Sequence, residues 1–281
     1  MGENDNMKQG VRIAYSGIEG SFASICVGKV FPEGIKVPYS SFAKAYEAVE
    51  NQECDLAVLP IENSFAGEVG KVSDLMFEGS LYVNGVYELK VSQCLVGVKD
   101  TSLAEVKTVI SHPQALDQCA TYIEEHGFEM IPVSNTARAA KKVATMDDPT
   151  VAAIASRESA SLYQLDVLDY SINESTQNTT RFAVFTRKSD IMEQEDENNT
   201  TILMFTVNHV AGSLARAISV IGDYGYNMRT IRSRPMKDKK WQYFFYTEVE
   251  GKVTSGKGKE MLKALEKECE ILKMVGSYKP E

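Results

Sequence analysis

The sequence predicts an α/β domain with largely parallel strands, followed by a smaller ferredoxin-like βαββαβ domain. Between residues 11 and 186, short apolar strand-like segments alternate with helical patterns, an order typical of a parallel sheet covered by helices. An acidic stretch at 188–199 follows, and a new pattern of strands and helices occupies 200–279. We therefore expect a first domain at 11–187, a linker at 188–199 and a second domain at 200–279.

The first domain contains apolar segments that are typical of buried strands. These segments are 11–15, 56–62, 107–111, 151–156 and 181–186. A helix is expected from about Ser21, and the clearest helical pattern covers 113–126, where apolar residues recur at the spacing of one helix face. Pro113 in the first turn and Gly127 just beyond the last residue match the preferred start and stop of a helix.

The second domain has the order strand, helix, strand, strand, helix, strand. Its expected segments are a strand at 201–207, a helix with Leu214, Ile218 and Ile221 on one face, a strand within 225–233, a strand at 241–249, a helix around Met261, Leu262 and Leu265, and a strand at 271–278. In the strand at 241–249, Phe244 and Tyr246 lie on the face opposite that of Trp241. We expect an oligomer to cover the edge or this open face of the sheet.

Composition limits the classes of function. The formal net charge of −9 disfavours nucleic acid as a partner, because phosphate binding needs a concentrated basic face. Apolar runs of roughly 18 residues, which a membrane span needs, are missing, and the polar N-terminus has no apolar signal core, so we expect a cytoplasmic protein. The five cysteines and three histidines are scattered, which predicts buried reduced thiols and no metal site.

Four short stretches place hydroxyl, amide or charged side chains at the end of an apolar strand or the start of a helix. They are 16–21 (SGIEGS), 62–64 (ENS), 111–114 (SHPQ) and 178–182 (NTTRF). Ligands of open α/β sheets bind at the carboxyl ends of strands and near helix N-termini. The fourth stretch precedes its strand, so it must reach such a site from elsewhere. Each stretch also has a structural explanation, as a turn, a surface loop or a helix cap.

Together these groups favour a ligand that carries carboxylates. Arg181 offers a planar fork for one carboxylate, and the amide and hydroxyl side chains supply neutral donors. Gln118 is either solvated surface or the inner rim of a cleft. The sequence shows no Ser–His–Asp order, no cysteine beside a base and no glycine-rich dinucleotide fingerprint. We therefore expect a chemistry that uses neither a covalent nucleophile nor a cofactor.

Several motifs in one order carry a family resemblance. YSGIEGSF, LPIENSFAGEV, SHPQALDQC and NTTRF are followed by GSLARAI and RSRP. In this the chain resembles prephenate dehydratases with a C-terminal ACT regulatory domain. The resemblance implies a two-lobed catalytic domain similar to periplasmic binding proteins, with a cleft between the lobes. It also implies the conversion of prephenate to phenylpyruvate in phenylalanine biosynthesis, no metal or organic cofactor, and a homodimer or homotetramer.

The resemblance also implies roles for single residues. Thr180 would donate a hydrogen bond to the departing hydroxyl, Arg181 would hold a carboxylate or fix the Thr180 loop, and Phe182 would pack against the ring. Substrate-orienting residues would be Glu62, Asn63, Ser64, Ser111, Gln118 and Asn178. The pocket for L-phenylalanine would use Asn208, Gly212, Ser213, Leu214 and Asn227, beside the strand at 232–235. Arg232 departs from the family, which commonly has an acid there.

Three other functions remain open at this point. Arogenate dehydratase performs the same chemistry on an aminated substrate, and the sequence does not separate it from prephenate dehydratase. A non-catalytic small-molecule binding protein could share the two-lobed fold. A stand-alone amino-acid sensor built around the ACT unit would leave the residues ahead of it unexplained. No segment resembling a chorismate mutase is expected in the chain.

Overall fold

The computed structural model describes residues 10–188, 199–237, 240–254 and 256–280, apart from residue 176. Residues 1–9 of the polar N-terminus and nearly all of the expected linker at 188–199 therefore lie outside the described residues. Contacts divide the chain into two compact units. Unit 1 comprises 1–69 and 87–182, and unit 2 comprises 70–86 and 183–281. Two strands, β5 (Tyr82–Lys90) and β11 (Thr179–Thr186), each begin in one unit and end in the other.

Unit 1 begins with a first module, residues 10–69, built around parallel strands. Its elements are β1 (Arg12–Ser16), α1 (Phe22–Val30), β2 (Ile35–Tyr39), α2 (Phe42–Glu50), β3 (Leu56–Asn63) and β4 (Gly67–Glu68). β1 pairs in parallel with both β2 and β3. Ser21 caps α1, as expected, because its hydroxyl accepts a bond from Ser24 N at 3.4 Å. The expected strands at 11–15 and 56–62 are thus confirmed, while β2 was not foreseen.

The second module of unit 1, residues 93–173, has its own sheet. Its elements are β6 (Cys94–Gly97), β7 (Thr108–Ser111), α4 (Pro113–Asp117), α5 (Ala120–His126), β8 (Glu129–Pro132), α6 (Thr136–Met146), β9 (Val151–Ala155), α7 (Arg157–Leu162) and β10 (Asp166–Asp169). The strand order is β10-β6-β9-β7-β8, with β7 parallel to β8 and β9, and β6 antiparallel to β9 and β10. The strands expected at 107–111 and 151–156 are confirmed as β7 and β9.

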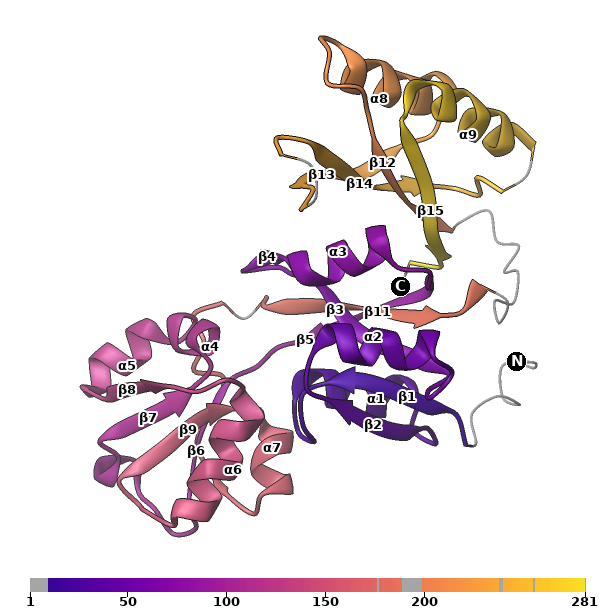
Figure 1. Cartoon of the computed structure of the whole chain (residues 1–281). Helices are drawn as coiled ribbons and strands as arrows, with labels where there is room; N and C mark the ends of the chain where they lie inside the picture. The colour runs from indigo at the N-terminus through magenta and orange to yellow at the C-terminus, as the bar shows by residue number, and fades with distance from the viewer. Residues whose placement is uncertain (1–9, 176, 189–198, 238–239, 255, 281) are drawn as a thin grey trace. The chain divides into compact units, whose positions relative to one another are not determined.

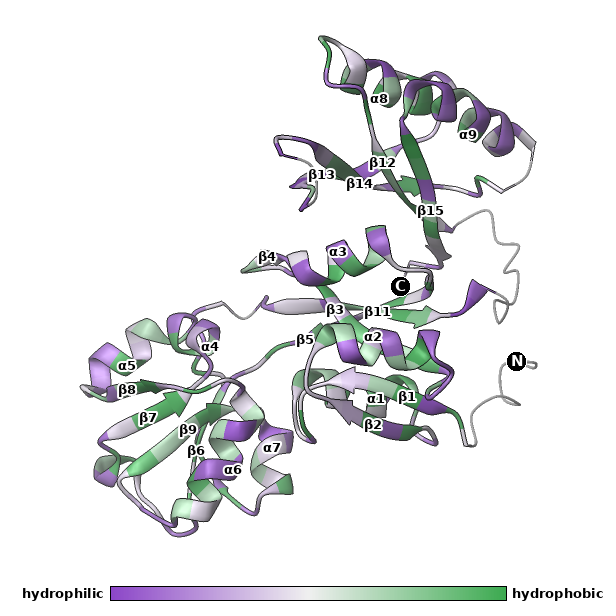
Figure 2. Ribbon diagram, in the orientation of Figure 1, coloured by the Kyte–Doolittle hydropathy of each residue, from purple (hydrophilic) through white to green (hydrophobic). Residues whose placement is uncertain are grey.

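Helices cover both faces of this second sheet (Figure 1). Ala139, Val143 and Ala160 bring α6 and α7 onto one face, and Leu116 and Ile123 bring α4 and α5 onto the other. Because both faces are covered, β7 and β9 are buried along nearly their whole length, and β9 is a continuous apolar run instead of an alternating one (Figure 2). Among the described residues, no helix is long and apolar enough to cross a bilayer.

The prediction of a single helix over 113–126 is wrong, because two helices, α4 and α5, form there. Pro113 starts α4 and Gly127 closes α5 in the left-handed conformation at φ 65°, as expected, but the helix breaks at Gln118 and Cys119. Gln118 O accepts a bond from Glu174 N at 2.9 Å, and its side chain accepts one from Asn178. These long-range bonds replace the continuous helical ladder.

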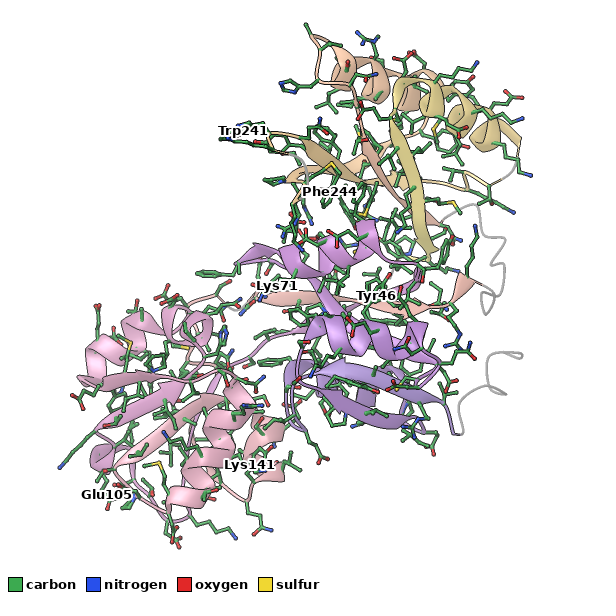
Figure 3. All side chains as sticks on the ribbon, in the orientation of Figure 1. Tyr46, Lys71, Glu105, Lys141, Trp241 and Phe244 are labelled. Atoms are coloured by element: carbon green, nitrogen blue, oxygen red, sulfur yellow. The ribbon has the colours of Figure 1, made fainter. Side chains whose placement is uncertain are left out.

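Unit 2 contains the βαββαβ order that the sequence predicts. Its elements are α3 (Gly70–Glu78), β12 (Thr200–Thr206), α8 (Ser213–Asp223), β13 (Met228–Pro235), β14 (Tyr243–Glu250), α9 (Gly256–Glu268) and β15 (Ile271–Tyr278), in the strand order β13-β14-β12-β15-β5. The strand expected at 241–249 starts two residues later. Trp241 adopts φ 62° in the turn before β14 and is 73% exposed (Figure 3).

The face of the β13-β14-β12-β15 sheet that carries Phe244 is covered by α3 of the same chain, so of the two expected places for a second copy, the edge or this face, the face is already occupied. Phe77 of α3 stacks on Phe244 with ring centroids 4.4 Å apart. Lys273 Nζ donates to Met76 O at 2.7 Å and to the carbonyls of Phe77 and Gly79. A cation at a helix C-terminus satisfies its last carbonyls and opposes the negative end of its dipole.

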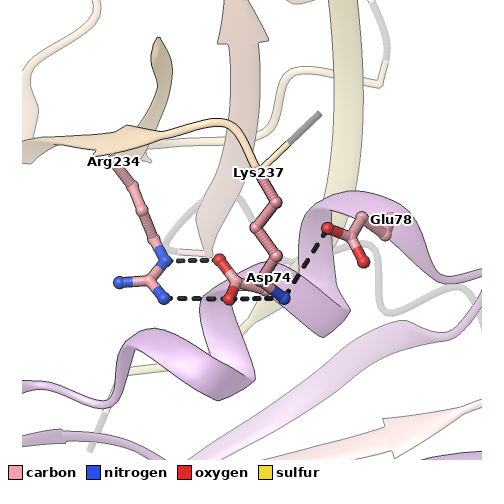
Figure 4. A network of polar contacts seen from close by, with 4 residues as sticks. All are labelled: Asp74, Glu78, Arg234 and Lys237. Atoms are coloured by element: carbon pink, nitrogen blue, oxygen red, sulfur yellow. Dashed lines mark hydrogen bonds and ion pairs between the residues drawn. The ribbon is translucent and has the colours of Figure 1, made fainter. Parts of the chain in front are cut away.

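An ion-pair cluster fixes α3 to β13 and the residues after it (Figure 4). Arg234 donates through two nitrogens to both carboxylate oxygens of Asp74, and Lys237 Nζ lies 2.9 Å from Asp74 Oδ2. Asp74 is 5% exposed. A side chain at Gly70 would clash with the Arg234 guanidinium, so α3 approaches β13 as closely as it does only with glycine there. Hydrogen bonding from Arg234, helped by Lys237, holds the pKa of Asp74 below its usual range despite burial.

We predict that Asp74→Asn lowers the free energy of unfolding by about 3 kcal/mol, because it removes the buried carboxylate charge that pairs with Arg234 and Lys237. Since the folded-state pKa of Asp74 is depressed, its contribution is present above about pH 4 and is lost as the pH falls further. Urea unfolding of both proteins at neutral and acidic pH measures this, and the difference between them should shrink in acid. Glu78→Gln is the control, because the exposed Glu78 lies 4.0 Å from Lys237 and should contribute less than about 1 kcal/mol. Equal effects of the two substitutions would contradict the prediction.

Candidate functional site

A buried amide side chain lies at the centre of the polar residues that the sequence singled out. Asn63 ends β3, and its Nδ2 faces the start of β11. This nitrogen donates to Asn178 Oδ1 at 2.8 Å, to Thr180 Oγ1 at 3.0 Å and to Thr179 O at 3.2 Å. Asn63, Asn178 and Thr180 are all buried, so each of these bonds replaces one that water would otherwise provide. The stretches 62–64 and 178–182, far apart in sequence, thus meet as expected.

The loop after Asn63 is shaped by the same side chain. Asn63 Oδ1 accepts bonds from Phe65 N at 3.1 Å and Ala66 N at 2.9 Å, which closes a turn typical of asparagine. Ser64 adds a second pair of hydrogen bonds between the two segments. Ser64 N donates to Thr179 O at 2.8 Å, and Thr179 N donates to Ser64 Oγ at 3.0 Å. The position of Thr180 relative to β3 is therefore fixed from two sides.

The second module of unit 1 joins this network through glutamines. Asn178 Nδ2 donates to Gln118 Oε1 at 2.9 Å, and Gln114 Nε2 lies 3.5 Å from Asn63 Oδ1. Gln118 is buried, so it is not solvated surface, and its bond to Asn178 brings it to the candidate site. The break between α4 and α5 is what turns Gln118 toward Asn178. We refer to Asn63, Gln118, Asn178 and Thr180 as the amide network.

Thr180 has a hydroxyl hydrogen that is available for donation to a ligand. Its oxygen accepts the bond from Asn63, so its own O–H hydrogen is not used in that bond and can be donated to a ligand. A hydroxyl that accepts one hydrogen bond donates another more strongly, because the chain of bonds polarises each member. Thr180 is 9% exposed, and electrostatic interactions are stronger at such a desolvated position than in water.

Arg181 and Glu62 lie on the opposite side of their strands. Neighbouring residues of a strand point to opposite faces, so Arg181 does not share the face of Thr180, and Glu62 does not share that of Asn63. Arg181 Nη1 donates to Glu62 Oε2 at 3.0 Å. This ion pair joins β11 to β3, and it supports the second of the two roles expected for Arg181, fixing the Thr180 segment. Phe182 is buried and occupies the same strand face as Thr180.

Ser111 is not brought into the amide network. It is fully buried, and its hydroxyl donates to Ile154 O of the neighbouring strand at 2.6 Å. His112 caps α4, because its Nδ1 accepts a bond from Gln114 N at 3.2 Å. Burial lowers the pKa of His112, which favours the neutral ring that this bond requires. The cap orients the first turn of α4, from which Gln114 reaches Asn63.

Two contributors were missed from the sequence. Gln114 stands in the quoted SHPQ stretch, and the signal was its place in the first turn of a helix that follows a strand. Thr179 acts through its backbone N and O, which no side-chain pattern reveals. The cysteines are free thiols as expected, four of them buried and Cys269 half-buried. Burial raises the pKa of the Cys119 and Cys269 thiols to about 12. Across the part of the chain that the structure describes, no three His, Cys, Asp or Glu side chains could hold a metal ion.

The residues expected to bind phenylalanine divide between two ends of the unit 2 sheet. Asn208 and Gly212 follow β12, Gly212 at φ 82° leads into α8, and Ser213 is buried in its first turn. Asn227 precedes β13, and its Nδ2 donates to Glu250 Oε2 at 2.9 Å. The C-terminal end of β12, at Thr206, lies at the same end of the sheet as the C-terminal end of β13, at Arg234, because both residues pair with Phe244 of β14. The N-terminal end of β12, at Thr200, pairs with Glu250 near the start of β13. Asn208 and Gly212 therefore lie at one end of the sheet, and Asn227 lies at the other end within one chain. Leu214, also expected there, packs toward the hydrophobic core instead.

Comparison with known proteins identifies the family. The family model described as prephenate dehydratase matches residues 13–190, which is more than half of the chain. A curated relative from Arabidopsis thaliana, named arogenate dehydratase/prephenate dehydratase 1, chloroplastic, is 32% identical over 282 residues. The match covers 95% of this chain and 72% of the relative.

Two solved structures share the fold over nearly all of the chain. One is prephenate dehydratase from Arthrobacter aurescens in complex with L-Phe, with a TM-score of 0.88 and 25% identity, covering 96% of this chain and 90% of that one. The other is GqqA, described as a novel type of quorum quenching acylase, with a TM-score of 0.88 and 28% identity, covering 96% and 98%. By the extent of the family match and the identity to its curated relative, the chain belongs to the prephenate dehydratase family and is a lyase of that kind.

Proposed function

We propose that the chain converts prephenate to phenylpyruvate, carbon dioxide and water, with the Thr180 hydroxyl assisting the departure of the ring hydroxyl. The observation that carries this proposal is the bond from Asn63 Nδ2 to Thr180 Oγ1 at 3.0 Å. It aims a buried hydroxyl and leaves its hydrogen available for a ligand. The catalytic domain would be 11–187, two-lobed as in binding proteins, with the ligand where the two modules of unit 1 meet.

The reaction needs help at one bond. As the ring carboxylate leaves as carbon dioxide, the electrons of its carbon–carbon bond move into the ring, and the carbon–oxygen bond to the hydroxyl breaks. The ring becomes aromatic, one proton is taken up, and the oxygen departs as water. Hydroxide is a poor leaving group, so a donor within about 2.6–3.2 Å of the departing oxygen lowers the barrier. Threonine is a very weak acid, so Thr180 serves by a hydrogen bond that strengthens as negative charge develops.

The other residues orient and enclose the substrate. Asn178 and Gln118 hold the amide network together, Ser64 fixes the segment that carries Thr180, and Phe182 on the same strand face as Thr180 shields the ring from water. Arg181 and Glu62 act on the strands themselves through their ion pair. This arrangement favours neutral donors at the reacting end of the substrate. A cation gripping the ring carboxylate there would oppose its loss as carbon dioxide.

Arogenate is the second candidate substrate. The Arabidopsis relative is named for both activities. The two substrates share the ring that carries the departing hydroxyl, and the amide network would act on that ring. They differ at the side chain that carries either a keto or an amino group. Turnover of purified protein on prephenate and on arogenate separates the two, and the absence of turnover on both would favour a non-catalytic binding protein.

We predict that Thr180→Val lowers kcat for prephenate by about 10²–10³-fold, the cost of removing one donor aimed at a developing charge. Valine keeps the volume and β-branching of threonine, so substrate affinity should change little. Thr180→Ser is the matched control, because it restores the hydroxyl and should retain most of the turnover. Phenylpyruvate formation measures the rate, and calorimetry with the Val variant measures binding. Near-normal kcat in Thr180→Val would remove Thr180 from the mechanism.

We further propose that 200–279 is an ACT domain that binds L-phenylalanine and regulates the enzyme. Support comes from its βαββαβ order and from the Arthrobacter relative, whose structure contains L-Phe. Asn208, Gly212 and Ser213 gather at one sheet end, so Asn227 would join them from a second copy in a homodimer or homotetramer. Arg232, the departure from the family, lies over the Tyr246 ring with its guanidinium carbon 5.6 Å from the ring centroid, which accommodates its charge.

We predict that L-phenylalanine binds and that Gly212→Ala weakens its binding by about fivefold. Alanine disfavours the left-handed backbone at φ 82° by about 1 kcal/mol, so the unliganded loop leaves the conformation that binds, and binding must restore it. Gly222→Ala, in α8 where the added Cβ would meet open space, is the control and should leave affinity unchanged. Isothermal titration measures both. No heat at millimolar phenylalanine would count against regulation through this domain.

A further inference from the structure

We propose that Ser159 and Tyr163, in and just after α7, are positioning residues that hold the 17–20 loop of the first module against the second module. This contact, called the loop latch below, would set how tightly the substrate binds. The proposal rests on the function proposed above. It concerns a contact separate from the amide network, because none of its residues belongs to that network.

The loop latch consists of two hydroxyl groups that donate to successive backbone carbonyls. Ser159 Oγ donates to Gly20 O at 2.9 Å, and Tyr163 Oη donates to Glu19 O at 2.8 Å. Ser159 is 0% exposed. Gly20 is buried, and a buried carbonyl without a partner is costly, so the Ser159 hydroxyl stabilises the loop only while the two modules are in contact. The Tyr163 hydroxyl adds a second bond at the exposed Glu19.

The loop is shaped to fit this surface. Gly17 and Gly20 have φ values of 121° and 86°, which favour glycine. A Cβ added at Gly20 would lie 3.0 Å from Ser159 Oγ and 3.2 Å from Leu162 Cδ2. One added at Gly17 would lie 2.9 Å from Ser21 Oγ of the same loop. Gly17 is thus needed for the turn itself, whereas Gly20 permits the close approach of the second module.

The Ser159 hydroxyl is itself oriented by a neighbour. Ser156 caps α7, and its Oγ donates to Ser159 Oγ at 3.0 Å while accepting from Ser159 N at 3.1 Å. Since the Ser159 oxygen accepts from Ser156, its hydrogen is directed to Gly20 O. The chain of two hydroxyls strengthens the terminal bond in the same way as the Asn63–Thr180 pair.

The loop latch and the amide network lie at the same edge of the first sheet. β1 and β3 are parallel, so the loop that follows Ser16 and the Asn63 end of β3 both belong to the carboxyl edge. In the second sheet β7 and β9 are parallel as well, so α4 and α7 both begin at its carboxyl edge. The two modules are therefore bridged at two places. At one, Gln114 reaches Asn63 directly and Gln118 reaches it through Asn178. At the other, Ser159 and Tyr163 hold the 17–20 loop. A ligand at the carboxyl edges is bounded by both bridges.

Loss of the loop latch should change binding more than chemistry. If only the bridged arrangement binds substrate, the apparent affinity falls in proportion to the fraction of molecules that remain bridged. Once substrate is bound, Thr180 and Asn63 keep their geometry. A hydrogen bond of ordinary strength corresponds to a factor of about two to ten. We therefore expect KM to rise about two- to tenfold for each hydroxyl removed, with kcat within about twofold of the original.

The test compares Tyr163→Phe and Ser159→Ala with Tyr170→Phe and Ser161→Ala. Tyr170 is 58% exposed, and Ser161 is an exposed residue of α7, so these controls remove the same atoms outside the loop latch. Steady-state kinetics on prephenate give KM and kcat, and hydrogen exchange of the unliganded protein reports the amides of residues 17–21. The proposal expects raised KM and faster exchange in the first pair only. Ser159→Ala could also destabilise α7, because Ser159 bonds the Ser156 cap. Tyr163→Phe removes only the bond to Glu19, so its result decides the test in that case.

The outcomes separate this proposal from the proposed function. Faster exchange at 17–21 in a protein that does not turn over prephenate would support the loop latch and contradict the function. Unchanged exchange and unchanged KM in Tyr163→Phe would overturn the loop latch and leave the function intact. A fall in kcat at constant KM would also overturn it, because the hydroxyl would then act on the chemistry and not on the bridged arrangement.

Discussion

The site depends on satisfying one buried amide. Asn63 has two hydrogens and one oxygen to satisfy without bulk water, and an unsatisfied buried polar group costs roughly 1–3 kcal/mol. Its nitrogen is placed among Asn178, Thr179 and Thr180, and its oxygen receives the turn at 65–66. The start of β11 and the end of β3 are thus held together by a requirement of hydrogen bonding. The orientation of the Thr180 hydroxyl follows from that requirement, because its oxygen must accept the bond from Asn63 Nδ2.

Other features of unit 1 serve the same constraint. The helix break at Gln118 gives up a regular ladder and supplies the acceptor that Asn178 needs. The neutral His112 ring caps α4, whose first turn carries Gln114. The Arg181–Glu62 pair ties the two strands from the opposite face. The proposed site is consequently lined by neutral donors, with the Arg181–Glu62 charges on the opposite strand face, which would suit a reaction that must release carbon dioxide from a carboxylate.

Sequence patterns predicted β1, β3, β7, β9 and β11, which are largely buried. They missed β5 and β6, and they missed β2, β8 and β10, which lie at sheet edges and keep polar or exposed residues. They also failed where long-range hydrogen bonds decide the structure. The expected helix at 113–126 breaks because of Asn178 and Glu174, some sixty residues away, and α3 covers Phe244 although it lies far earlier in the chain. The period of two along a strand already separates Thr180 from Arg181, so that part was available from sequence. Pairing through the Thr179 backbone was not, because it leaves no side-chain signature.

The most direct measurement of the central claim is a crystal structure with an unreactive analogue that retains the ring hydroxyl of prephenate. The account predicts that Thr180 Oγ1 lies within about 2.6–3.2 Å of that hydroxyl oxygen, while Asn63 Nδ2 still donates to Thr180. An analogue bound with its hydroxyl on another group, beyond the reach of Thr180, would contradict the account.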